Sequence, residues 1–365
     1  MAYNAAQMGG AKLKGLVLSG GKGSRLRPFT YTGAKQLVPV ANKPVLFYAI
    51  EQLVASGIDE IGIITGDTGA EVREALGDGS RFGCRFTFIP QEAPLGVAHA
   101  VKIAQPFMGD APFVVFLGDN FLRGGIERHV EAFRESHADA MVLLAHVANP
   151  RDFGVAVLDG EGKLTRLIEK PVEPPTDLAV IGLYMFSPRF FEAAGQITPS
   201  ARGELEITDA IQKLVDLGGD VRATVIDGDW IDTGRMGDIL AANRIVLSDV
   251  EPTLDGAYVD ERSKIEGRVV LQAGARIVNS TIVGPAIVGE NTEVVDSRIG
   301  PFVSIYHHCR VNGAEIESSI VLERSVIDRP GAKIQDSLIG RDVTLEGGGK
   351  ALRLVIGDHS QMELS

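Results

Sequence analysis

The sequence contains little cysteine, no long apolar run and no cluster of positive charge. Its two cysteines, Cys84 and Cys309, lie far apart, which gives neither a disulfide framework nor a metal-ligand spacing and fits a reducing cytoplasm. No apolar run approaches the roughly 18 residues of a membrane span, and the N-terminus has no apolar signal-peptide core. These features predict a cytoplasmic protein without a membrane partner.

Negative charge outweighs positive charge. The 36 lysines and arginines face 48 aspartates and glutamates, which gives a formal net charge of −12 at pH 7. Nucleic acid is therefore excluded as the main partner, because a phosphate backbone requires a clustered basic face. An anionic substrate would have to bind to cations that are placed locally.

The length of 365 residues exceeds one average domain, since roughly 100–200 residues per domain is usual. We predict one domain over residues 12–250 and a second over residues 251–365, with Pro252 breaking the chain between them. Residues 1–11 are interpreted as a tag or a disordered lead.

The first domain alternates short β-branched runs with amphipathic stretches. Strand-like runs lie at residues 16–18, 61–64, 113–117 and 141–145, and helix-like stretches lie at 45–55, 96–104, 126–135 and 241–247. This alternation is the βαβ rhythm of a parallel sheet. It predicts an α/β fold with an open, doubly wound, mostly parallel sheet.

The second domain has a regular aliphatic repeat. Spacings of six, six and five give a period of seventeen at Ile265, Leu271, Ile277, Ile282, Val288, Val294, Ile299, Ile305, Val311, Ile316 and Leu322. Three near-hexads per turn are typical of a left-handed parallel β-helix, in which each face of a coil points one aliphatic residue inward. The register slips after Leu322, so we expect irregular final coils in which Ile327, Ile334 and Ile339 resume the repeat. The alternative is chance spacing in an all-β sandwich.

A glycine-rich loop follows the first strand and ends in cations. Gly20, Gly21 and Gly23 would let backbone N–H groups approach a phosphate, beside Ser24 and Arg25. An arginine can grip phosphate oxygens with two hydrogen bonds. The loop is neither a P-loop nor the motif of the dinucleotide binders, and a plain flexible turn remains the alternative.

Lys35 follows in the run Ala34-Lys35-Gln36-Leu37-Val38-Pro39-Val40, where a solvated surface lysine is the ordinary interpretation. Together with the glycine loop and Lys43-Pro44-Val45, this run resembles the signature of the sugar-1-phosphate nucleotidyltransferases, most closely the long-form glucose-1-phosphate thymidylyltransferases. The resemblance extends from Leu13 to the last coils. It implies a Rossmann-like nucleotidyltransferase domain in which the glycine loop with Arg25 holds the triphosphate and Lys35 neutralises phosphates.

Gln91 and Gly96 are the candidates for nucleobase binding. A side-chain amide can donate and accept hydrogen bonds at one pyrimidine edge, and a glycine lets a base pack on the backbone. The resemblance implies base contacts at these two positions, and a turn into a helix is the alternative. His99 stands where short-form relatives often carry glutamine, and no role is assigned to it.

Asp119 and Asp232 are the candidate ligands of Mg²⁺. Asp119 comes directly after a buried strand, where open α/β sheets bind ligands, and Mg²⁺ commonly takes one or two carboxylates plus phosphate oxygens. The resemblance implies that both aspartates bind the metal, and a turn aspartate is the alternative for Asp119. Ile231 departs from the lysine of many long-form relatives, which puts a minor phosphate contact in doubt.

The sugar-phosphate half of the site is implied at Gly154, Glu169, Lys170, Gly182 and Tyr184, with Glu204 as a weaker candidate. Glu169 could accept hydrogen bonds from sugar hydroxyls while Lys170 pairs with the phosphate. An exposed surface ion pair is the ordinary alternative for these two residues, and only the resemblance favours the site.

Together with these residues, the resemblance implies an enzyme that transfers a nucleotidyl group from dTTP to glucose 1-phosphate, with Arg25, Lys35 and Lys170 as catalytic cations. The substrates are a nucleoside triphosphate and a sugar 1-phosphate, Mg²⁺ is the cofactor, and the β-helix is expected to mediate a homo-oligomer. Three alternatives stay open. They are the same chemistry with UTP or another sugar, an added acyl transfer by His307 or His308, and a non-catalytic sensor.

Overall fold

A computed structural model of the chain describes residues 12–21, 23–31, 33–347, 351–352, 354–358 and 361–364. The segment 1–11, interpreted above as a tag or disordered lead, lies outside these residues. The described chain forms two compact units. The first unit comes from the segments Met1–Lys22 and Leu46–Asp232, and the second comes from Gly23–Val45 and Thr233–Ser365. The domain boundary at residues 250 and 251 stays a prediction, because compactness groups the segment Gly23–Val45 with the C-terminal part.

A nine-stranded mixed sheet forms the centre of the first unit. Its main path runs β10-β9-β11-β6-β1-β4-β5, and β8 pairs with both β11 and β12. Strands β1, β4, β5 and β6 are parallel, whereas β11 is antiparallel to β6, β8 and β9. The strands are β1 (Lys14–Ser19), β4 (Glu60–Thr65), β5 (Arg85–Pro90), β6 (Phe113–Leu117), β8 (Ala140–His146), β9 (Gly154–Leu158), β10 (Leu164–Glu169), β11 (Leu178–Phe186) and β12 (Val221–Val225).

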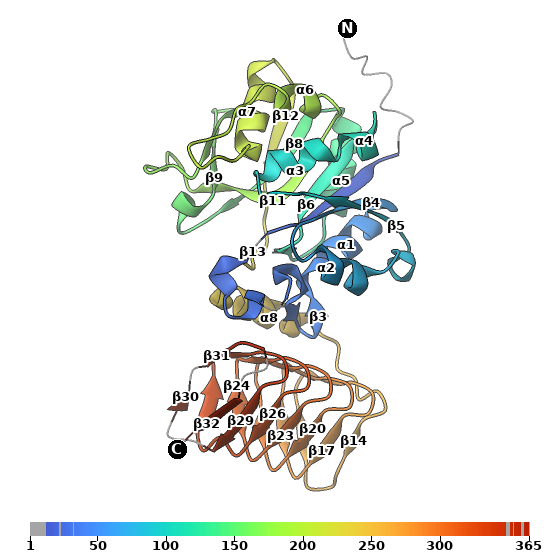
Figure 1. The fold of residues 1–365 in the computed structure, drawn as a ribbon, viewed down its shortest axis with the longest axis vertical. Coiled ribbons are helices and arrows are strands. Elements are labelled where there is room, and N and C mark those ends of the chain that lie inside the picture. Colours follow the sequence, from blue (N-terminus) through green and yellow to red (C-terminus); the bar gives the residue numbers. More distant parts are fainter. Residues whose placement is uncertain are drawn as a thin grey trace. The chain divides into compact units, whose positions relative to one another are not determined.

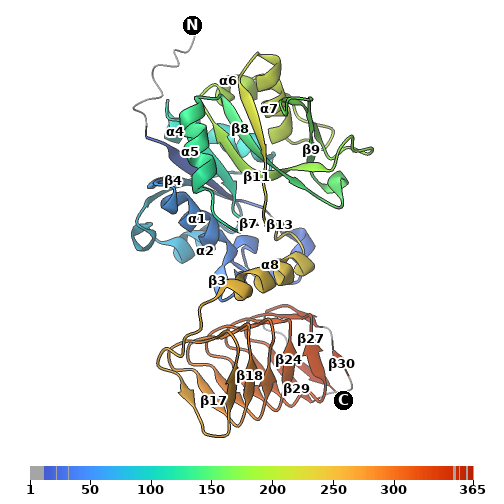
Figure 2. The same ribbon diagram turned by 180° about the vertical axis from the view of Figure 1, so that it is seen from behind.

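Helices cover both faces of this sheet, which confirms the doubly wound α/β fold. Leu16 and Val115 pack in one core with residues of α3, α6 and α7, on the face seen in Figure 1. Their strand neighbours Val17 and Val114 point the other way and are equally buried; α5 lies on that face in the reverse view of Figure 2. The helices are α1 (Val45–Ala55), α2 (Gly69–Leu76), α3 (Val97–Ile103), α4 (Gln105–Met108), α5 (Glu127–Ser136), α6 (Phe190–Ala194) and α7 (Ile207–Asp216).

Shorter elements complete the two units. In the first unit, β7 (Asn120–Leu122) pairs antiparallel with β13 (Trp230–Asp232). In the second, β2 (Pro39–Val40) and β3 (Lys43–Pro44) form a hairpin, and α8 (Met236–Asp249) is longer than the predicted stretch 241–247. The 3₁₀ turns are η2 (Ser24–Leu26), η3 (Phe29–Tyr31), η4 (Lys35–Leu37), η5 (Ser80–Phe82) and η6 (Pro150–Asp152).

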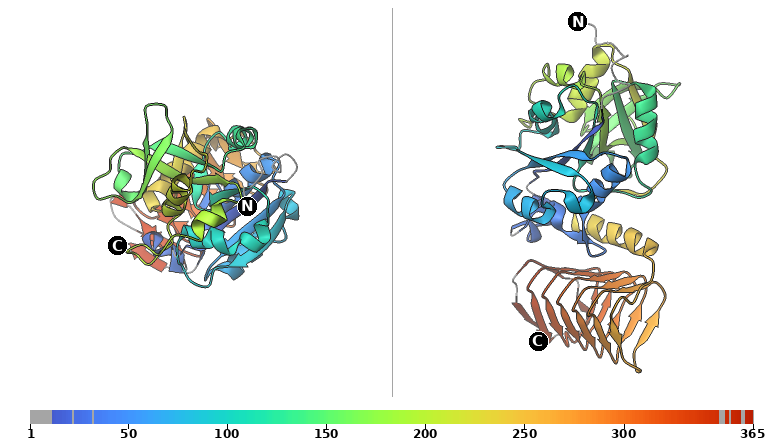
Figure 3. Two further views of the ribbon diagram at one scale, coloured as in Figure 1. Left: turned by 90° about the horizontal axis from the view of Figure 1, so that it is seen from above. Right: turned by 90° about the vertical axis from the view of Figure 1, so that its right-hand side faces the viewer.

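The rest of the second unit is the left-handed parallel β-helix that the repeat predicts. Three parallel sheets of seven, six and six strands stack coil upon coil, as Figures 1 and 3 show. The first sheet is β14 (Tyr258–Val259), β17 (Arg276–Val278), β20 (Glu293–Val295), β23 (Arg310–Asn312), β26 (Val326–Asp328), β29 (Thr344–Gly347) and β32 (Gln361–Leu364). The second is β15 (Lys264–Glu266), β18 (Thr281–Val283), β21 (Arg298–Ile299), β24 (Glu315–Glu317), β27 (Lys333–Gln335) and β30 (Ala351–Leu352). The third is β16 (Val269–Leu271), β19 (Ala286–Val288), β22 (Val303–Ile305), β25 (Ile320–Val321), β28 (Leu338–Ile339) and β31 (Val355–Ile356).

The register of the coils corrects one predicted core position. Ile305 pairs with Val321, so Val321 points into the core where Leu322 was expected. The coil between these partners is one residue shorter than the predicted period of seventeen, which accounts for the slip. Ile334 and Ile339 are fully buried in the same core, and parallel pairing continues beyond them, so the later described coils continue the stack. Among the described residues, no helix combines the length and apolar character needed to cross a membrane.

Candidate functional site

The start of the glycine-rich loop lies against the predicted nucleobase residue. Strand β1 ends at Ser19, and the backbone of Gly20 approaches Gly66 so closely that a Cβ on Gly66 would lie 2.7 Å from the Gly20 carbonyl oxygen. A Cβ on Gly20 would lie 3.4 Å from Oε1 of Gln91. Gly20, its neighbour Gly21 and Gln91 therefore belong to one corner of the first unit.

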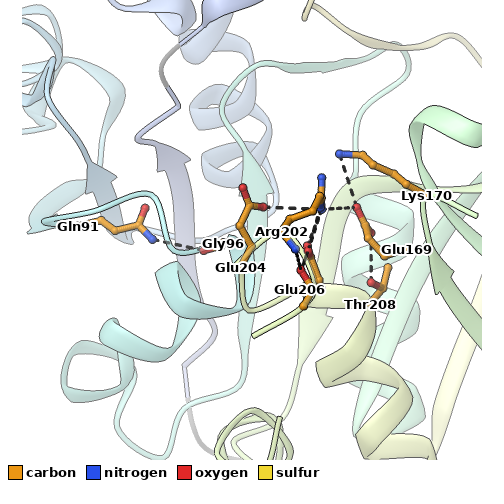
Figure 4. A network of polar contacts seen from close by, with 9 residues as sticks. Gln91, Gly96, Glu169, Lys170, Arg202, Glu204, Glu206 and Thr208 are labelled. Atoms are coloured by element: carbon orange, nitrogen blue, oxygen red, sulfur yellow. Dashed lines mark hydrogen bonds and ion pairs between the residues drawn. The ribbon is translucent and has the colours of Figure 1, made fainter. Parts of the chain in front are cut away.

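Two contacts orient the Gln91 side chain. Its Nε2 donates to the carbonyl oxygen of Gly96 at 3.3 Å and lies 3.0 Å from Nδ1 of His99, and Figure 4 shows the amide beside Gly96. Burial, and then the Lys102 charge, lower the pKa of His99, so the neutral ring can accept from Nε2. The amide oxygen of Gln91 therefore faces Gly20. Sequence reasoning assigned no role to His99, because the sequence alone does not show that its ring lies beside the Gln91 side chain.

At Gly96 the backbone of this corner packs closely against the segment that carries Glu204. Gly96 has φ of 104°, and a Cβ there would collide with the carbonyl oxygen of Leu205. The Leu205 carbonyl accepts from Ala98 N at 3.0 Å, and Leu205 N donates to the Leu95 carbonyl at 2.8 Å. Only glycine allows this approach.

The predicted sugar-phosphate residues line one cavity of about 180 Å³ in the first unit. Gly154, Glu169, Lys170, Gly182 and Tyr184 all belong to its wall, together with Glu204 and Asp232. The sequence reasoning assigned no role to seven polar or aromatic lining residues, which are Asn120, Asp152, Phe153, Arg202, Glu206, Thr208 and Trp230.

Backbone geometry turns both Glu169 and Lys170 into this cavity. Consecutive strand residues normally point to opposite faces. Strand β10 ends at Glu169, and Lys170 adopts a left-handed conformation with φ of 41°. Its N–H donates to the Phe153 carbonyl at 3.0 Å, and its Nζ lies 3.7 Å from Oε1 of Glu169. A non-glycine residue held at positive φ is uncommon and often marks a functional position.

Arg202 links three carboxylates of the cavity wall. Its Nη2 lies 3.1 Å from Glu169, 3.7 Å from Glu204 and 2.9 Å from both oxygens of Glu206. Figure 4 shows the guanidinium between these side chains. Glu206 is only 4% exposed, so Arg202 offsets the cost of burying this carboxylate.

Burial shifts the titration of two groups in the cavity. It raises the pKa of Glu169, opposed mainly by the Lys170 charge and increased by Glu206. It also raises the pKa of Tyr184, with smaller contributions from Glu169 and Asp119. The tyrosine hydroxyl therefore stays protonated and can donate a hydrogen bond to a bound sugar or phosphate.

Pairing of β7 with β13 brings the two predicted metal ligands close together. Asp232 is the register partner of Asn120, the residue directly after Asp119. Asn120 is 3% exposed and donates from Nδ2 to Asp119 at 3.0 Å. Its Oδ1 accepts from Trp230 Nε1 at 2.7 Å and from Gly182 N at 3.2 Å, and a Cβ on Gly182 would lie 2.6 Å from that oxygen. Asn120 thus fixes the position of Asp119.

The donor atoms at this point fit a magnesium ion. Asp119 and Asp232 offer carboxylate oxygens, the hard ligands that Mg²⁺ prefers. Within the part of the chain that the structure describes, no group of three or more acidic, histidine or cysteine side chains could enclose a metal ion. Two carboxylates suit a metal that takes its remaining ligands from water and phosphate.

The remaining predicted phosphate residues lie in the second unit. Gly23 has φ of 57°, and a Cβ there would lie 2.7 Å from Thr30, whose hydroxyl donates to the Gly23 carbonyl at 2.7 Å. Ser24 and Arg25 follow in η2. Lys35 is 8% exposed, so the solvated surface lysine of the alternative interpretation does not describe it.

The charges of Arg25 and Lys35 act on a carboxylate at the start of α8. Burial raises the pKa of Asp238, and the charges of Arg235, Arg25 and Lys35 oppose this shift. The positive charges of these three residues are therefore felt by one acidic side chain. Such a group of cations can bind an anion with several negative oxygens.

The two histidines considered for acyl transfer lie at a corner of the β-helix between β22 and β23. The ring of His307 packs against that of Tyr306 with centroids 3.7 Å apart and planes inclined by 34°, and burial lowers its pKa. His308 is exposed. The ring contact holds His307 against its own coil.

Comparisons with known proteins agree with this geometry. A family model described as nucleotidyl transferase matches residues 14–249. Two glucose-1-phosphate thymidylyltransferases, from Streptomyces antibioticus and Streptomyces griseus, are each 51% identical over 356 residues, covering 96% and 97% of this chain and 99% and 100% of those proteins. A Bacillus anthracis structure assigned as a glucose-1-phosphate thymidylyltransferase has a TM-score of 0.62 at 36% identity, covering 66% of this chain and 97% of that one. The chain therefore belongs to the nucleotidyl transferase family, and within it to the group of the glucose-1-phosphate thymidylyltransferases.

Proposed function

We propose that the enzyme transfers a thymidylyl group from dTTP to glucose 1-phosphate and releases pyrophosphate. One observation carries the proposal more than any other. The cavity that holds Glu169, Lys170 and Asp232 is joined, through Leu205 and Gly96, to the corner where Gln91 presents its amide. The cavity can then bind a sugar phosphate while the adjacent corner binds a nucleobase.

The chemistry requires alignment of anions more than proton removal. A phosphate monoester is ionised at neutral pH, so an oxygen of the sugar 1-phosphate can attack the α-phosphorus in line while pyrophosphate leaves. No covalent enzyme intermediate is needed. We assign Lys170 to the sugar phosphate, and Arg25 and Lys35 to the triphosphate, because each can stabilise negative charge that shifts during transfer.

The acceptor sugar is positioned by groups of complementary hydrogen-bonding character. Glu169 is an acceptor for sugar hydroxyls, and the protonated hydroxyl of Tyr184 is a donor. Gly154 keeps this wall open, because a Cβ there would lie 2.5 Å from Thr208 and 3.3 Å from Glu169. A hexose ring with several hydroxyls matches such a wall.

The nucleobase is assigned to Gln91 and Gly96. With Nε2 engaged by Gly96 and His99, the amide oxygen can accept the N3–H that both thymine and uracil carry. This contact selects against cytosine and adenine, whose ring nitrogens at that edge are acceptors, but it does not separate dTTP from UTP. UTP is therefore the second candidate donor.

Asp119 and Asp232 are the residues that would hold Mg²⁺. When bound, the ion draws negative charge from phosphate oxygens and helps to align them. Asn120 keeps Asp119 in place through its hydrogen bond. The protein itself contributes the two carboxylates and the cations that neutralise the negative charge of the substrates.

We also propose that the enzyme is a cytoplasmic homo-oligomer. Both cysteines are free and buried, which suits a reducing compartment. At the first coil of the β-helix, Leu254 and Tyr258 are 52% and 53% exposed. Exposed apolar side chains at the end of a solenoid favour contact with another copy.

The test is pyrophosphate release with Mg²⁺, measured over a matrix of dTTP, UTP, ATP, CTP and GTP against glucose 1-phosphate and related sugar phosphates. We expect the highest kcat/KM for dTTP with glucose 1-phosphate. Asp119→Ala should abolish turnover, whereas Asp227→Ala, which changes an exposed aspartate outside the cavity wall, should retain it. Absence of release with every pair would reject the enzymatic proposal for these substrates.

A further inference from the structure

The loop that carries Arg25 and Lys35 is attached to the β-helix within the second unit. After Lys35 the chain forms the hairpin β2–β3, whose turn residues Ala41 and Asn42 have φ of 48° and 59°. The Asn42 side chain donates from Nδ2 to the carbonyl oxygen of Ile305, in β22 of the β-helix, at 2.7 Å. The tip of the hairpin therefore contacts a coil directly.

Asn243 of α8 strengthens this attachment. Its Oδ1 accepts the Ala41 N–H at 2.8 Å and the Ser304 hydroxyl at 2.7 Å. Asn243 and Ser304 are each 1% exposed. One buried oxygen thus joins the hairpin, helix α8 and the β-helix, and a buried polar contact of this kind is costly to lose.

The same helix carries a carboxylate on which the charges of Arg25 and Lys35 act. That carboxylate is Asp238, in the first turn of α8, while Asn243 lies further along the helix and accepts a hydrogen bond from the hairpin. Lys35 is the first residue of the short turn η4, only Val38 separates that turn from the hairpin, and Val45 N donates to the Val38 carbonyl at 3.2 Å. A movement of the hairpin would therefore also move Lys35.

We propose that Asn243 and Ser304 are positioning residues for the phosphate-binding cations, and that the β-helix uses them to hold the loop in its nucleotide-binding conformation. The β-helix then contributes to dTTP binding in addition to any role in assembly. This inference rests on the proposed function, because it takes Arg25 and Lys35 as ligands of the triphosphate.

Ser304→Ala in the full-length protein is the sharpest perturbation, since it removes one hydroxyl and leaves the rest of the coil unchanged. Loss of one buried hydrogen bond should weaken dTTP binding about fivefold to tenfold. The matched control is Ser325→Ala. Ser325 is also fully buried, but its hydroxyl donates to Gly340 at 2.7 Å and accepts Val343 N, all within the β-helix.

The experiment measures dTTP binding by equilibrium titration without sugar phosphate, together with KM for each substrate. Ser304→Ala should raise the Kd and KM for dTTP and leave the KM for glucose 1-phosphate unchanged, whereas Ser325→Ala should leave all three unchanged. Hydrogen exchange of the Ala41 amide should also become faster in Ser304→Ala only. Equal dTTP affinity of the two variants, or unchanged exchange of that amide, would overturn the proposal.

Two substitutions of Asn243 separate positioning from general stability. Both hydrogen bonds reach Oδ1, so Asn243→Asp keeps the acceptor while Asn243→Leu removes it. Slow exchange at Ala41 should be retained in the first variant and lost in the second, and identical behaviour of the two would contradict the positioning role. If the wild-type protein bound no dTTP, the proposed function would fail, yet the exchange of Ala41 would still decide whether Asn243 and Ser304 hold the loop.

Discussion

Glu169→Gln should lower catalysis while raising stability, which is the pattern expected of a functional carboxylate. A carboxylate offers about four lone-pair positions. Arg202, Lys170 and Thr208 approach three of them, at 3.1, 3.7 and 3.1 Å. About one position is therefore left for a sugar hydroxyl, and the amide of glutamine replaces its charge with a weaker acceptor.

The expected loss follows from that single bond. A hydrogen bond to a charged group contributes about 1.5–3 kcal/mol, so kcat/KM for glucose 1-phosphate should fall about 10- to 150-fold. The dTTP affinity should not change. The matched control is Glu173→Gln, which alters an exposed glutamate and should retain wild-type kinetics.

Stability should change in the opposite direction. Burial raises the pKa of Glu169 above its ordinary value of 4.5, so the folded state favours the protonated form and the charged form destabilises it at neutral pH. This cost is absent below pH 4.5 and develops as the pH rises through the raised pKa. Glu169→Gln should therefore have a higher Tm than the wild type at pH 8, and the difference should vanish near pH 4.

The assay pairs initial rates of pyrophosphate release with thermal unfolding at several pH values. A kcat/KM within twofold of the wild type would refute the assignment of Glu169 to the sugar. A Tm that falls at pH 8 would refute the reasoning from burial, because it would mean that the ion pairs with Arg202 and Lys170 outweigh desolvation.

The remaining predictions concern the nucleobase corner. Gly96→Ala should destabilise the protein by at least about 2 kcal/mol, because a side chain at φ of 104° would also collide with Leu205. Urea unfolding measures this, and Gly83→Ala, at φ of 76° and ψ of 23° in the left-handed helical region with open space around it, should cost only about 1 kcal/mol. A similar cost for both variants would contradict the close packing. His99→Leu should weaken dTTP binding about fivefold by releasing one hydrogen bond of Gln91. In the wild type the same weakening should appear as the pH falls through the lowered pKa of His99, because the charged ring cannot accept that bond. Titrations of dTTP across pH 5–8 test both statements, and equal pH dependence in His99→Leu would contradict them.

The protein's regular architecture could be predicted from local patterns. Apolar periodicity records which face of each element is buried, so the runs at residues 61–64 and 113–117 predicted β4 and β6, and the aliphatic repeat predicted the β-helix. The one misplaced core residue, Leu322, lies where a coil is shortened by one residue. Such a deletion changes register, and register depends on pairing with the neighbouring coil.

Motifs likewise identified candidates for the site, because glycines and charged residues at fixed spacing carry a chemical meaning. Glu169 and Lys170 were selected only through the family resemblance, and they do line one cavity. Arg202, Glu206 and Asn120 were missed because an isolated arginine, glutamate or asparagine in a sequence is ordinarily solvated.

Tertiary structure decided the partnerships among those residues. Arg202 meets Glu169 from 33 positions away, and Asn243 meets Ala41 from 202 positions away. The sequence determined which faces are buried and which residues can do chemistry, since both are properties of short segments. Only the folded chain determined which polar groups share a hydrogen bond, because long-range pairing of strands and helices brings them within 3 Å of each other.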